Sequence, residues 1–215
     1  TVAQAQSSTL SGIVTGDAGL IKDGIGQLIL TNNVAYTGGT TINAGTVILG
    51  QQASLGLGAV TLQAGSTLET VVSLANTIQL TGDNNSNTTT DTVNLVVAQG
   101  QSSTLSQVVA GDAGLVKAGA GVLTLNAANT YVGGTTVNAG TVALGSQASL
   151  GTGAVTLKAG TTLDTAASLT NTIQLTGDGN SSTTTDTVNL VVAQGQNSTL
   201  SQVVAGDAGL VKAGA

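Results

Sequence analysis

The stretch that decides the fold runs from Gly121 to Gly145 and reads GVLTLNAANTYVGGTTVNAGTVALG. Apolar and polar residues alternate in short segments, and residues such as glycine and asparagine stand between these segments. Alternation with a period of two is typical of a β-strand, whereas Gly and Asn favour turns because they tolerate a positive φ. The stretch therefore predicts short strands that follow one another around tight corners.

The chain repeats itself with a period of 95 residues: the segment that begins at Val2 returns at Val97 and again at Val192. Such a period indicates a repeat architecture in which each unit packs on its neighbours. We divide the chain into repeat unit 1 (1–95), repeat unit 2 (96–190) and the start of repeat unit 3 (191–215). We expect these units to form one continuous solenoid that is a fragment of a longer array.

Short alternating segments continue through the whole unit. In unit 2 they are 122–125, 135–137, 141–144, 154–157, 161–163, 172–175 and 187–190. Helix is disfavoured because Gly and Thr interrupt every window long enough to show a period of 3.6, and the segments are too short for a β-sandwich. The pattern predicts an all-β chain folded as a β-solenoid, with about three short strands per coil, about four coils per unit and a total length of roughly 40 to 45 Å.

The composition suits a narrow interior and excludes several other classes of protein. Hydrophobic residues make up 40% of the chain but aromatic residues only 1%, so the core must consist mainly of aliphatic side chains. The 31 glycines follow no Gly-X-Y rule and proline is absent, which excludes collagen. Cysteine is absent too, which excludes disulfides and thiolate metal sites. The longest apolar runs are far shorter than a membrane span.

Residues 119–145 resemble the autotransporter-associated β-strand repeat, or passenger-associated transport repeat, of Gram-negative surface proteins. The resemblance rests on Leu123-x-Leu125, Asn129-Thr130-Tyr131, Gly133-Gly134-Thr135-Thr136 and Asn138-Ala139-Gly140-Thr141. Unit 1 keeps this pattern except that Val34-Ala35 replaces Asn-Thr, and we expect a weaker turn there. The resemblance implies a right-handed parallel β-helix that is secreted through an outer-membrane barrel and serves adhesion, autoaggregation or biofilm formation at the bacterial cell surface.

The motif residues also have structural roles that follow from their chemistry. Gly133-Gly134 permits a corner that a Cβ would block, and Asn138 can bond to its own backbone in the next turn. The two tyrosines are the only aromatic residues, and we expect each to pack on a coil or cover a corner. The structural motif residues are Tyr36, Gly38, Gly39, Asn43, Gly45, Tyr131, Gly133, Gly134, Asn138 and Gly140.

The chain offers few groups for catalysis or for binding nucleic acid. It has no His, Cys or Arg, so the commonest general base, the thiol nucleophile and the bidentate phosphate clamp are missing. Asp17 and Asp23 could approach each other, but unit 2 has Asp112 and Ala118 at these positions. Glu69 and Asp164 are solitary. A pI near 4.1 disfavours nucleic acid. We expect neither an enzyme nor a cofactor.

Two polar segments, 81–92 and 176–187, interrupt the strand pattern, and we interpret them as solvated loops. The first contains Asp83-x-Asn85-x-Asn87, but it lacks the glycine and the glutamate that a calcium loop requires at positions six and twelve. We therefore assign no metal site. The weak candidate ligands are Asp83, Asp91, Asp178 and Asp186, and the Asn-x-Ser/Thr triplets at Asn84, Asn87 and Asn180 are attributed to chance.

Three functions remain open at this level. The chain could be the stalk of an extracellular adhesin whose partner is a ligand on a host or bacterial surface. It could instead be a subunit that assembles with copies of itself into a filament or surface layer. A polysaccharide-active β-helix enzyme is disfavoured, because it requires a groove lined by carboxylates.

Overall fold

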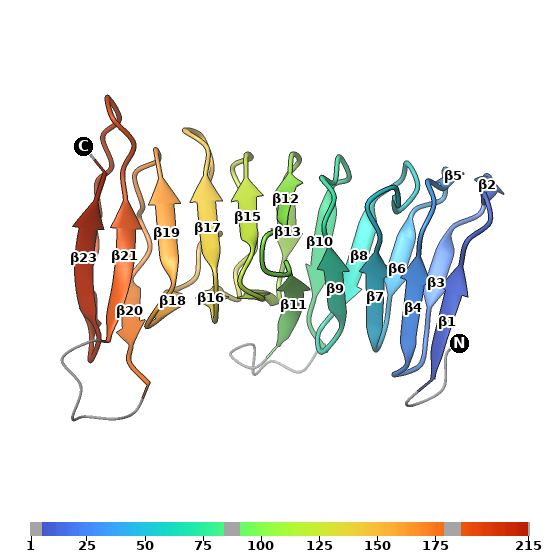
Figure 1. Ribbon diagram of the computed structural model, residues 1–215, viewed down its shortest axis with the longest axis horizontal. Coiled ribbons are helices and arrows are strands. Elements are labelled where there is room, and N and C mark those ends of the chain that lie inside the picture. The colour runs from blue at the N-terminus through green and yellow to red at the C-terminus, as the bar shows by residue number, and fades with distance from the viewer. Residues whose placement is uncertain (1–5, 84–90, 179–185, 215) are drawn as a thin grey trace.

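The computed structural model describes residues 6–83, 91–178 and 186–214. These residues form 23 β-strands, all paired in parallel, and they contain no helix. The strands wind into an elongated coil, and the two ends of the described chain lie at opposite ends of the rod (Figure 1). Within these residues, no helical segment could cross a membrane.

The first face of the rod is a ten-stranded sheet. Its strands in spatial order are β1 (Ser7–Leu10), β4 (Gln27–Leu30), β7 (Thr46–Leu49), β9 (Thr67–Thr70), β11 (Thr92–Val96), β14 (Gly114–Ala118), β16 (Thr135–Val137), β18 (Val155–Lys158), β20 (Ile173–Thr176) and β22 (Val204–Gly206). Each strand between the two outermost ones pairs with the strand one coil before it and one coil after it, so this face runs the length of the rod.

The second face consists of a two-stranded and a six-stranded sheet. Its strands are β2 (Thr15–Gly16), β5 (Ala35–Tyr36), β12 (Ser102–Leu105), β15 (Val122–Leu125), β17 (Thr141–Leu144), β19 (Thr162–Thr165), β21 (Thr187–Val191) and β23 (Gly209–Ala213). Less regular segments join the two sheets, because Leu57 N–H donates to Tyr36 O and Leu74 forms a parallel bridge with Leu105.

The third face begins as a five-stranded sheet. Its strands are β3 (Leu20–Lys22), β6 (Thr40–Ile42), β8 (Val60–Gln63), β10 (Ile78–Thr81) and β13 (Val109–Gly111). Beyond β13 this face continues without regular strands: Thr130 N–H donates to Val109 O, Thr152 N–H donates to Tyr131 O, and Leu169 forms a parallel bridge with Leu200.

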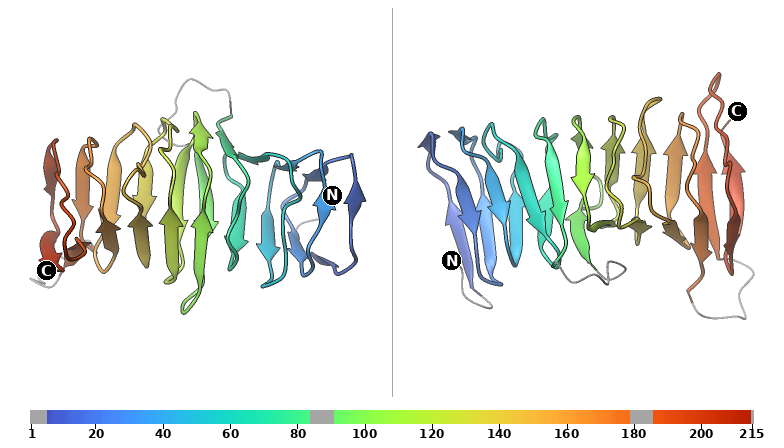
Figure 2. Two further views of the ribbon diagram at one scale, coloured as in Figure 1. Left: turned by 90° about the horizontal axis from the view of Figure 1, so that it is seen from above. Right: turned by 180° about the vertical axis from the view of Figure 1, so that it is seen from behind.

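One coil visits the first, second and third faces in turn. The first described coil uses β1, β2 and β3, and β4 then returns to the first face beside β1. Ten strands stacked at about 4.8 Å make a rod about 43 Å long. Two further views show the same stacking along the rod (Figure 2). The predicted all-β solenoid is therefore confirmed, and each coil has three sides, some of which are less regular segments in place of strands.

Aliphatic ladders fill the interior because alternate residues of each strand point inwards. On the first face, Val47, Leu68 and Leu95 are neighbours in register on successive coils, and each is at most 1% exposed. Burial of one leucine side chain contributes about 1.5 to 3 kcal/mol. Since each coil contacts mainly its two neighbours, the stability of the rod is approximately a sum of such nearest-neighbour contributions.

The outward residues of the first face form a second row in unbroken register. In spatial order the row is Ser7, Gln27, Thr46, Thr67, Asn94, Val116, Thr136, Thr156, Gln174 and Ala205. Most of these side chains are small or uncharged and polar. This row of the first face carries no charged side chain, although the neighbouring outward row of the same face includes Glu69 on β9 and the exposed Lys158 on β18.

Candidate functional surface

Units 1 and 2 each contain a buried tyrosine–threonine pair. Tyr131 Oη lies 2.6 Å from Thr135 Oγ1, which itself donates to Leu150 O over 2.9 Å. Because the hydroxyl proton of the threonine serves Leu150 O, the tyrosine must donate to the threonine. Burial raises the pKa of Tyr131, which is fully enclosed. The pair thus satisfies two buried hydroxyl groups and fastens one coil to the next.

Unit 1 has the same arrangement. Tyr36 Oη lies 2.6 Å from Thr40 Oγ1, and Thr40 donates to Leu55 O over 2.8 Å. Tyr36 is 2% exposed, and burial raises its pKa as well. Neither tyrosine ring faces solvent, so neither is available as a surface for a ligand.

Glycines leave room for the tyrosine rings and for the stacked corners. Gly151 has a φ of +69°, and a Cβ at this position would lie 2.7 Å from Cδ2 of Tyr131. Gly134 has a φ of +86°, and its Cβ would lie 2.7 Å from Ala154 O of the next coil. These glycines of unit 2 are therefore required both by backbone conformation and by the close approach of a neighbouring coil.

Asn129 links three successive coils in unit 2. Its Oδ1 accepts from Val109 N–H over 2.8 Å, and its Nδ2 donates to Ser149 O over 2.8 Å. In unit 1 the equivalent residue is Val34, whose side chain cannot form these bonds. Ser54 Oγ instead accepts from Val34 N–H over 2.9 Å and lies 2.7 Å from Val34 O. Ser54 Oγ also lies 2.6 Å from Asn33 Oδ1, so a different set of bonds between coils holds the corner of unit 1.

A buried lysine at a corner of each unit binds three backbone carbonyl groups. Lys117 Nζ donates to Ala118 O, Gly119 O and Ala139 O over 3.0, 2.6 and 3.1 Å. Its side chain has no exposed surface, and this burial lowers the pKa of Lys117 to about 8. We call this arrangement the lysine cage. It connects two coils, because Ala139 belongs to the coil after Ala118.

Lys22 forms the corresponding cage in unit 1. Its Nζ donates to Asp23 O, Gly24 O and Ala44 O over 3.3, 2.5 and 2.9 Å. Burial lowers the pKa of Lys22, although the nearby Asp23 carboxylate opposes this shift. Asp23 itself accepts a hydrogen bond from Asn43 Nδ2 over 2.7 Å. The cation therefore completes a backbone turn.

Aspartates close the base of each polar segment. In unit 1, Gly82 N–H donates to Asp112 Oδ1 over 2.8 Å, and Asp83 N–H donates to Asp91 Oδ2 over 3.0 Å. We call these four residues the neck of unit 1. The neck of unit 2 repeats both bonds at 2.8 and 2.9 Å, with Gly177 paired to Asp207 and Asp178 to Asp186. The carboxylates thus hold the backbone N–H groups of the last two described residues before 84–90 and before 179–185.

The weak metal candidates thus lie in the two necks. Among the described residues, no group of three or more His, Cys, Asp or Glu side chains is placed to hold a metal ion. The residues 84–90 and 179–185 lie outside the described part of the chain. These ranges include Asn85 and Asn87 of the calcium-like pattern and the triplets at Asn84, Asn87 and Asn180.

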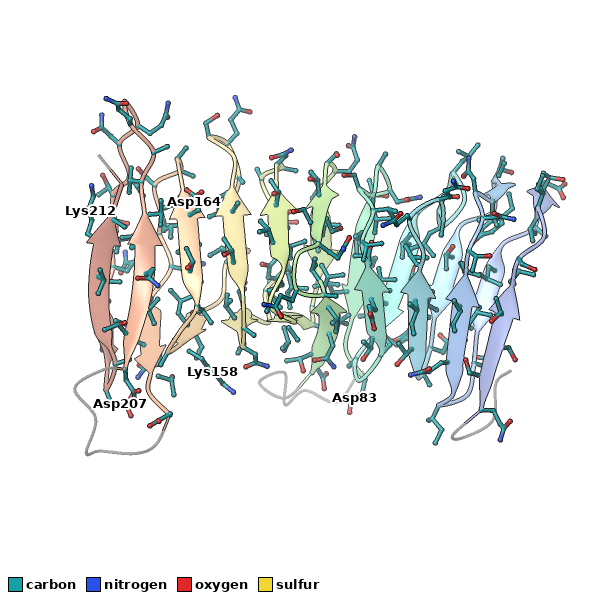
Figure 3. All side chains as sticks on the ribbon, in the orientation of Figure 1. Asp83, Lys158, Asp164, Asp207 and Lys212 are labelled. Carbon is teal, nitrogen blue, oxygen red and sulfur yellow. The ribbon has the colours of Figure 1, made fainter. Side chains whose placement is uncertain are left out.

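The charged side chains labelled in Figure 3 are spread along the described part of the rod. In Figure 3, Asp83 lies near the middle of the rod, whereas Asp164, Asp207 and Lys212 lie towards its C-terminal end. One surface depression is lined by 132–136, Gly153, Ala154 and Thr156, and another by Ile13, Asn32, Asn33, Ala35 and Gln52. Neither depression contains a carboxylate or a lysine. These two depressions lack the acid–base groups that hydrolysis of a polysaccharide requires.

The comparison with protein families matches the two segments that contain the residues just described. The family model of the passenger-associated-transport-repeat matches residues 20–49 and 115–144. These two segments are similar to that repeat. Each segment includes one lysine cage and one tyrosine–threonine pair, since Lys22, Tyr36 and Thr40 fall in the first, and Lys117, Tyr131 and Thr135 in the second.

A second comparison found a curated protein that is similar to this chain. The Adhesin BmaC autotransporter of Brucella suis biovar 1 (strain 1330) is 34% identical over 147 residues. The alignment covers 63% of this chain and 4% of that protein, so the chain spans a small part of the length of this relative. No solved structure matches the chain.

The sequence predicts tight turns at the glycines of each matched segment, and Gly39, Gly45, Gly134 and Gly140 have a positive φ in the structure. Tyr36 belongs to strand β5, whereas Tyr131 lies outside the strands. The sequence pattern does not predict the lysine cage or the necks. A signal for both is present, because Lys22, Lys117 and Lys212 recur with the unit, as do Asp112 and Asp207. A charged residue that recurs at the same position of each unit can be buried with a structural role or exposed on the surface, and the recurrence alone does not distinguish the two.

Proposed function

We propose that the chain is a rod-forming spacer in the extracellular passenger of a bacterial surface protein and that it holds an adhesive region away from the cell. The observation that carries this proposal is the ten-stranded first face, whose outward row keeps its register from Ser7 to Ala205. A rod of this kind gains length with every unit. The similarity to a protein named an adhesin autotransporter supports both the location and the adhesive context.

The physical basis of the spacer is the bonding between successive coils. Backbone ladders on three faces are reinforced at the corners by the lysine cages, the tyrosine–threonine pairs and Asn129. All these groups are satisfied within the rod, so they stabilise it without offering a reactive surface. This distribution of polar groups supports a non-catalytic function.

A series of deletions in the full-length protein on the cell surface tests the proposal. Removal of one unit, residues 96–190, joins identical unit boundaries and shortens the rod by about 21 Å at 4.8 Å per coil. We expect surface display to persist and adhesion to decline gradually as more units are removed, because reach decreases. Abrupt loss of adhesion after removal of a single unit, with display intact, contradicts a spacer and places the binding site in that unit.

A matched surface variant separates reach from direct binding. Thr136→Lys and Thr156→Lys change two neighbouring outward side chains of the first face and leave the length unchanged. We expect wild-type adhesion from this variant. Electron microscopy of the same cells tests the self-assembly alternative: single thin rods support the spacer, whereas thick fibres with a regular period favour a filament or surface layer.

A further inference from the structure

Equivalent residues of the three units lie on three different faces of the rod. Leu10, Leu105 and Leu200 occupy the same position in units 1, 2 and 3. Leu10 belongs to β1 on the first face, and Leu105 belongs to β12 on the second face. Leu200 bridges Leu169 on the third face. The start of each unit is thus displaced by one face from the start of the unit before it.

The outward rows show the same displacement through the whole unit. On the first face, Thr67 and Asn94 of unit 1 are followed in register by Val116 and Thr136 of unit 2. The unit 1 counterparts of these last two residues, Ile21 and Thr41, lie on the third face. At the pairing of β11 with β14, the first face therefore changes from strands of unit 1 to strands of unit 2 whose unit 1 counterparts lie on the third face.

The displacement arises because a unit does not contain a whole number of coils. From Ser7 to Val96 the chain forms thirteen sides: β1 to β7, the segment at Leu57, β8, β9, the segment at Leu74, β10 and β11. Three sides make one coil, so a unit comprises four coils and one additional side. The sequence estimate of about four coils per unit is correct for the number of coils but misses this extra side.

We propose that the array is a three-unit screw, in which every surface feature of a unit appears on the three faces in turn and returns to its first orientation after three units. One unit then advances about 21 Å and turns by one third of a revolution, and three units advance thirteen coils, or about 62 Å. This inference concerns the surface that the array presents and stands independently of the proposed spacer function.

The necks show what the screw does to that surface. The neck of unit 1 lies between β10 and β11, at the edge between the third and first faces. The neck of unit 2 lies between β20 and β21, at the edge between the first and second faces. The equivalent neck in unit 3 is expected between the second and third faces. Three consecutive units therefore present their necks around the whole circumference.

The screw limits which partners can bind several units at once. A second copy of the rod lying alongside would meet equivalent side chains only after every third unit, so lateral contacts cannot repeat with every unit. A compact partner that binds one unit can instead approach the rod from any side. The interaction surface of the array consequently fits single-unit partners distributed around the rod better than a sheet of laterally packed rods.

Disulfide formation in the intact chain tests the displacement at the boundary between units 1 and 2. The protein has no cysteine, so introduced thiols are unambiguous. Val96 and Ala118 are direct neighbours on β11 and β14. We expect Val96→Cys/Ala118→Cys to form a disulfide at least about tenfold faster than Val96→Cys/Thr104→Cys, since a bond requires Cα atoms within about 7 Å.

Further cysteine pairs make the result independent of one variant. Thr104→Cys/Thr124→Cys lies within the second face and should react as readily as the boundary pair. Asn94→Cys/Val116→Cys provides a second pair at the same boundary. Rapid disulfide formation in Val96→Cys/Thr104→Cys instead, in chains that retain β-type circular dichroism, overturns the screw because β12 would then continue the first face.

The complete array is tested by imaging. A Gln79→Cys substitution, repeated at the equivalent position of every unit, places a thiol for a gold label on one exposed side chain per unit. In the full-length protein we expect labels on the same side of the rod every 62 Å or so, at 4.8 Å per coil. Labels on one side at intervals of about 21 Å overturn the three-unit screw but leave the spacer function intact.

Discussion

The hydroxyl of Tyr131 donates to the hydroxyl of Thr135 across 2.6 Å, and Thr135 in turn donates to the carbonyl of Leu150. This short chain joins the corner of one coil to the backbone of the next. This hydrogen bond stabilises the fold, because a tyrosine hydroxyl buried without a partner in an aliphatic interior would lose its hydration without compensation. The pair explains how a core with two tyrosines and no other aromatic residue accommodates them.

The tyrosine–threonine chain predicts different costs for its two members. Tyr131→Phe removes one hydrogen bond while Thr135 keeps its acceptor, so we expect a loss of about 0.5 to 1.5 kcal/mol in the free energy of unfolding. Thr135→Val leaves both the tyrosine hydroxyl and Leu150 O without this partner, and a loss of about 1 to 3 kcal/mol is expected. Urea denaturation of both variants measures the difference, and a smaller loss for Thr135→Val contradicts the assignment of donors.

The close approach of Gly151 to the ring of Tyr131 predicts a larger effect than backbone conformation alone. Gly160 is the matched control, because it has a φ of +79° and a Cβ added there would have no atom within 4 Å, whereas Gly151 has a φ of +69°. Gly160→Ala should cost about 1 to 2 kcal/mol from the left-handed conformation. Gly151→Ala should cost about 1 to 3 kcal/mol more, since both the carbonyl oxygen and the ring of Tyr131 must move. Equal melting temperatures for the two variants would contradict this close approach.

The bridging amide of Asn129 predicts that its removal weakens the corner of unit 2. Asn129→Ala deprives Val109 N–H and Ser149 O of their side-chain partner, and we expect a loss of about 1 to 3 kcal/mol. Asn126→Ala is the control, because Asn126 is exposed on the same connection and should change the stability by less than about 0.5 kcal/mol. Similar urea midpoints for both variants contradict the bridging role.

The lysine cage predicts a pH dependence of stability. The folded chain holds the pKa of Lys117 near 8, whereas an exposed lysine in the unfolded chain titrates at about 10.4. Between these values the unfolded chain binds more protons, so the free energy of unfolding should rise as the pH increases. The window from pH 8 to about 9.5 is suitable, because ionisation of tyrosine in the unfolded chain opposes the effect near pH 10.

The comparison of two lysine variants isolates this contribution. Lys117→Met should reduce the rise in stability between pH 8 and 9.5, and the remaining rise is attributed to Lys22, whose pKa is lowered in the same direction. Lys158→Met is the control, because Lys158 is exposed on β18. An unchanged pH profile for Lys117→Met shows that the buried ammonium is not the titrating group.

The strands of the rod could be predicted well from the sequence because alternation reports directly which side chains point inwards. The expected segments 122–125, 135–137 and 141–144 coincide with β15, β16 and β17. The expected segment 154–157 is displaced by one residue from β18, whose last residue Lys158 is exposed. Such shifts at strand ends follow from hydrogen bonds to the next coil, which the sequence of one segment does not contain.

The contacts at the corners could not be predicted because they join residues about twenty positions apart. Lys117 and Ala139 meet only because one coil places them above each other, and Asn129 meets Val109 and Ser149 for the same reason. The identity of a turn residue indicates a turn but not the direction of its side chain. The inward lysine is therefore visible only once the register of neighbouring coils is known.

The number of sides per unit also required the structure. The segments at Leu57 and Leu74 act as sides of a coil through single bonds and bridges, and they lack the alternation of a strand. An estimate from the number of residues per coil consequently gives four coils per unit and misses the additional side. That single side decides which face every unit occupies.

The length gained per unit tests the solenoid most directly. Electron microscopy of full-length rods that differ by three units should show a difference of about 62 Å, because thirteen coils stack at about 4.8 Å. A chain of separate compact domains of 95 residues would instead gain roughly 32 Å per unit, or about 96 Å for three. A measured difference near 62 Å supports a continuous three-sided rod, and a difference near 96 Å contradicts it.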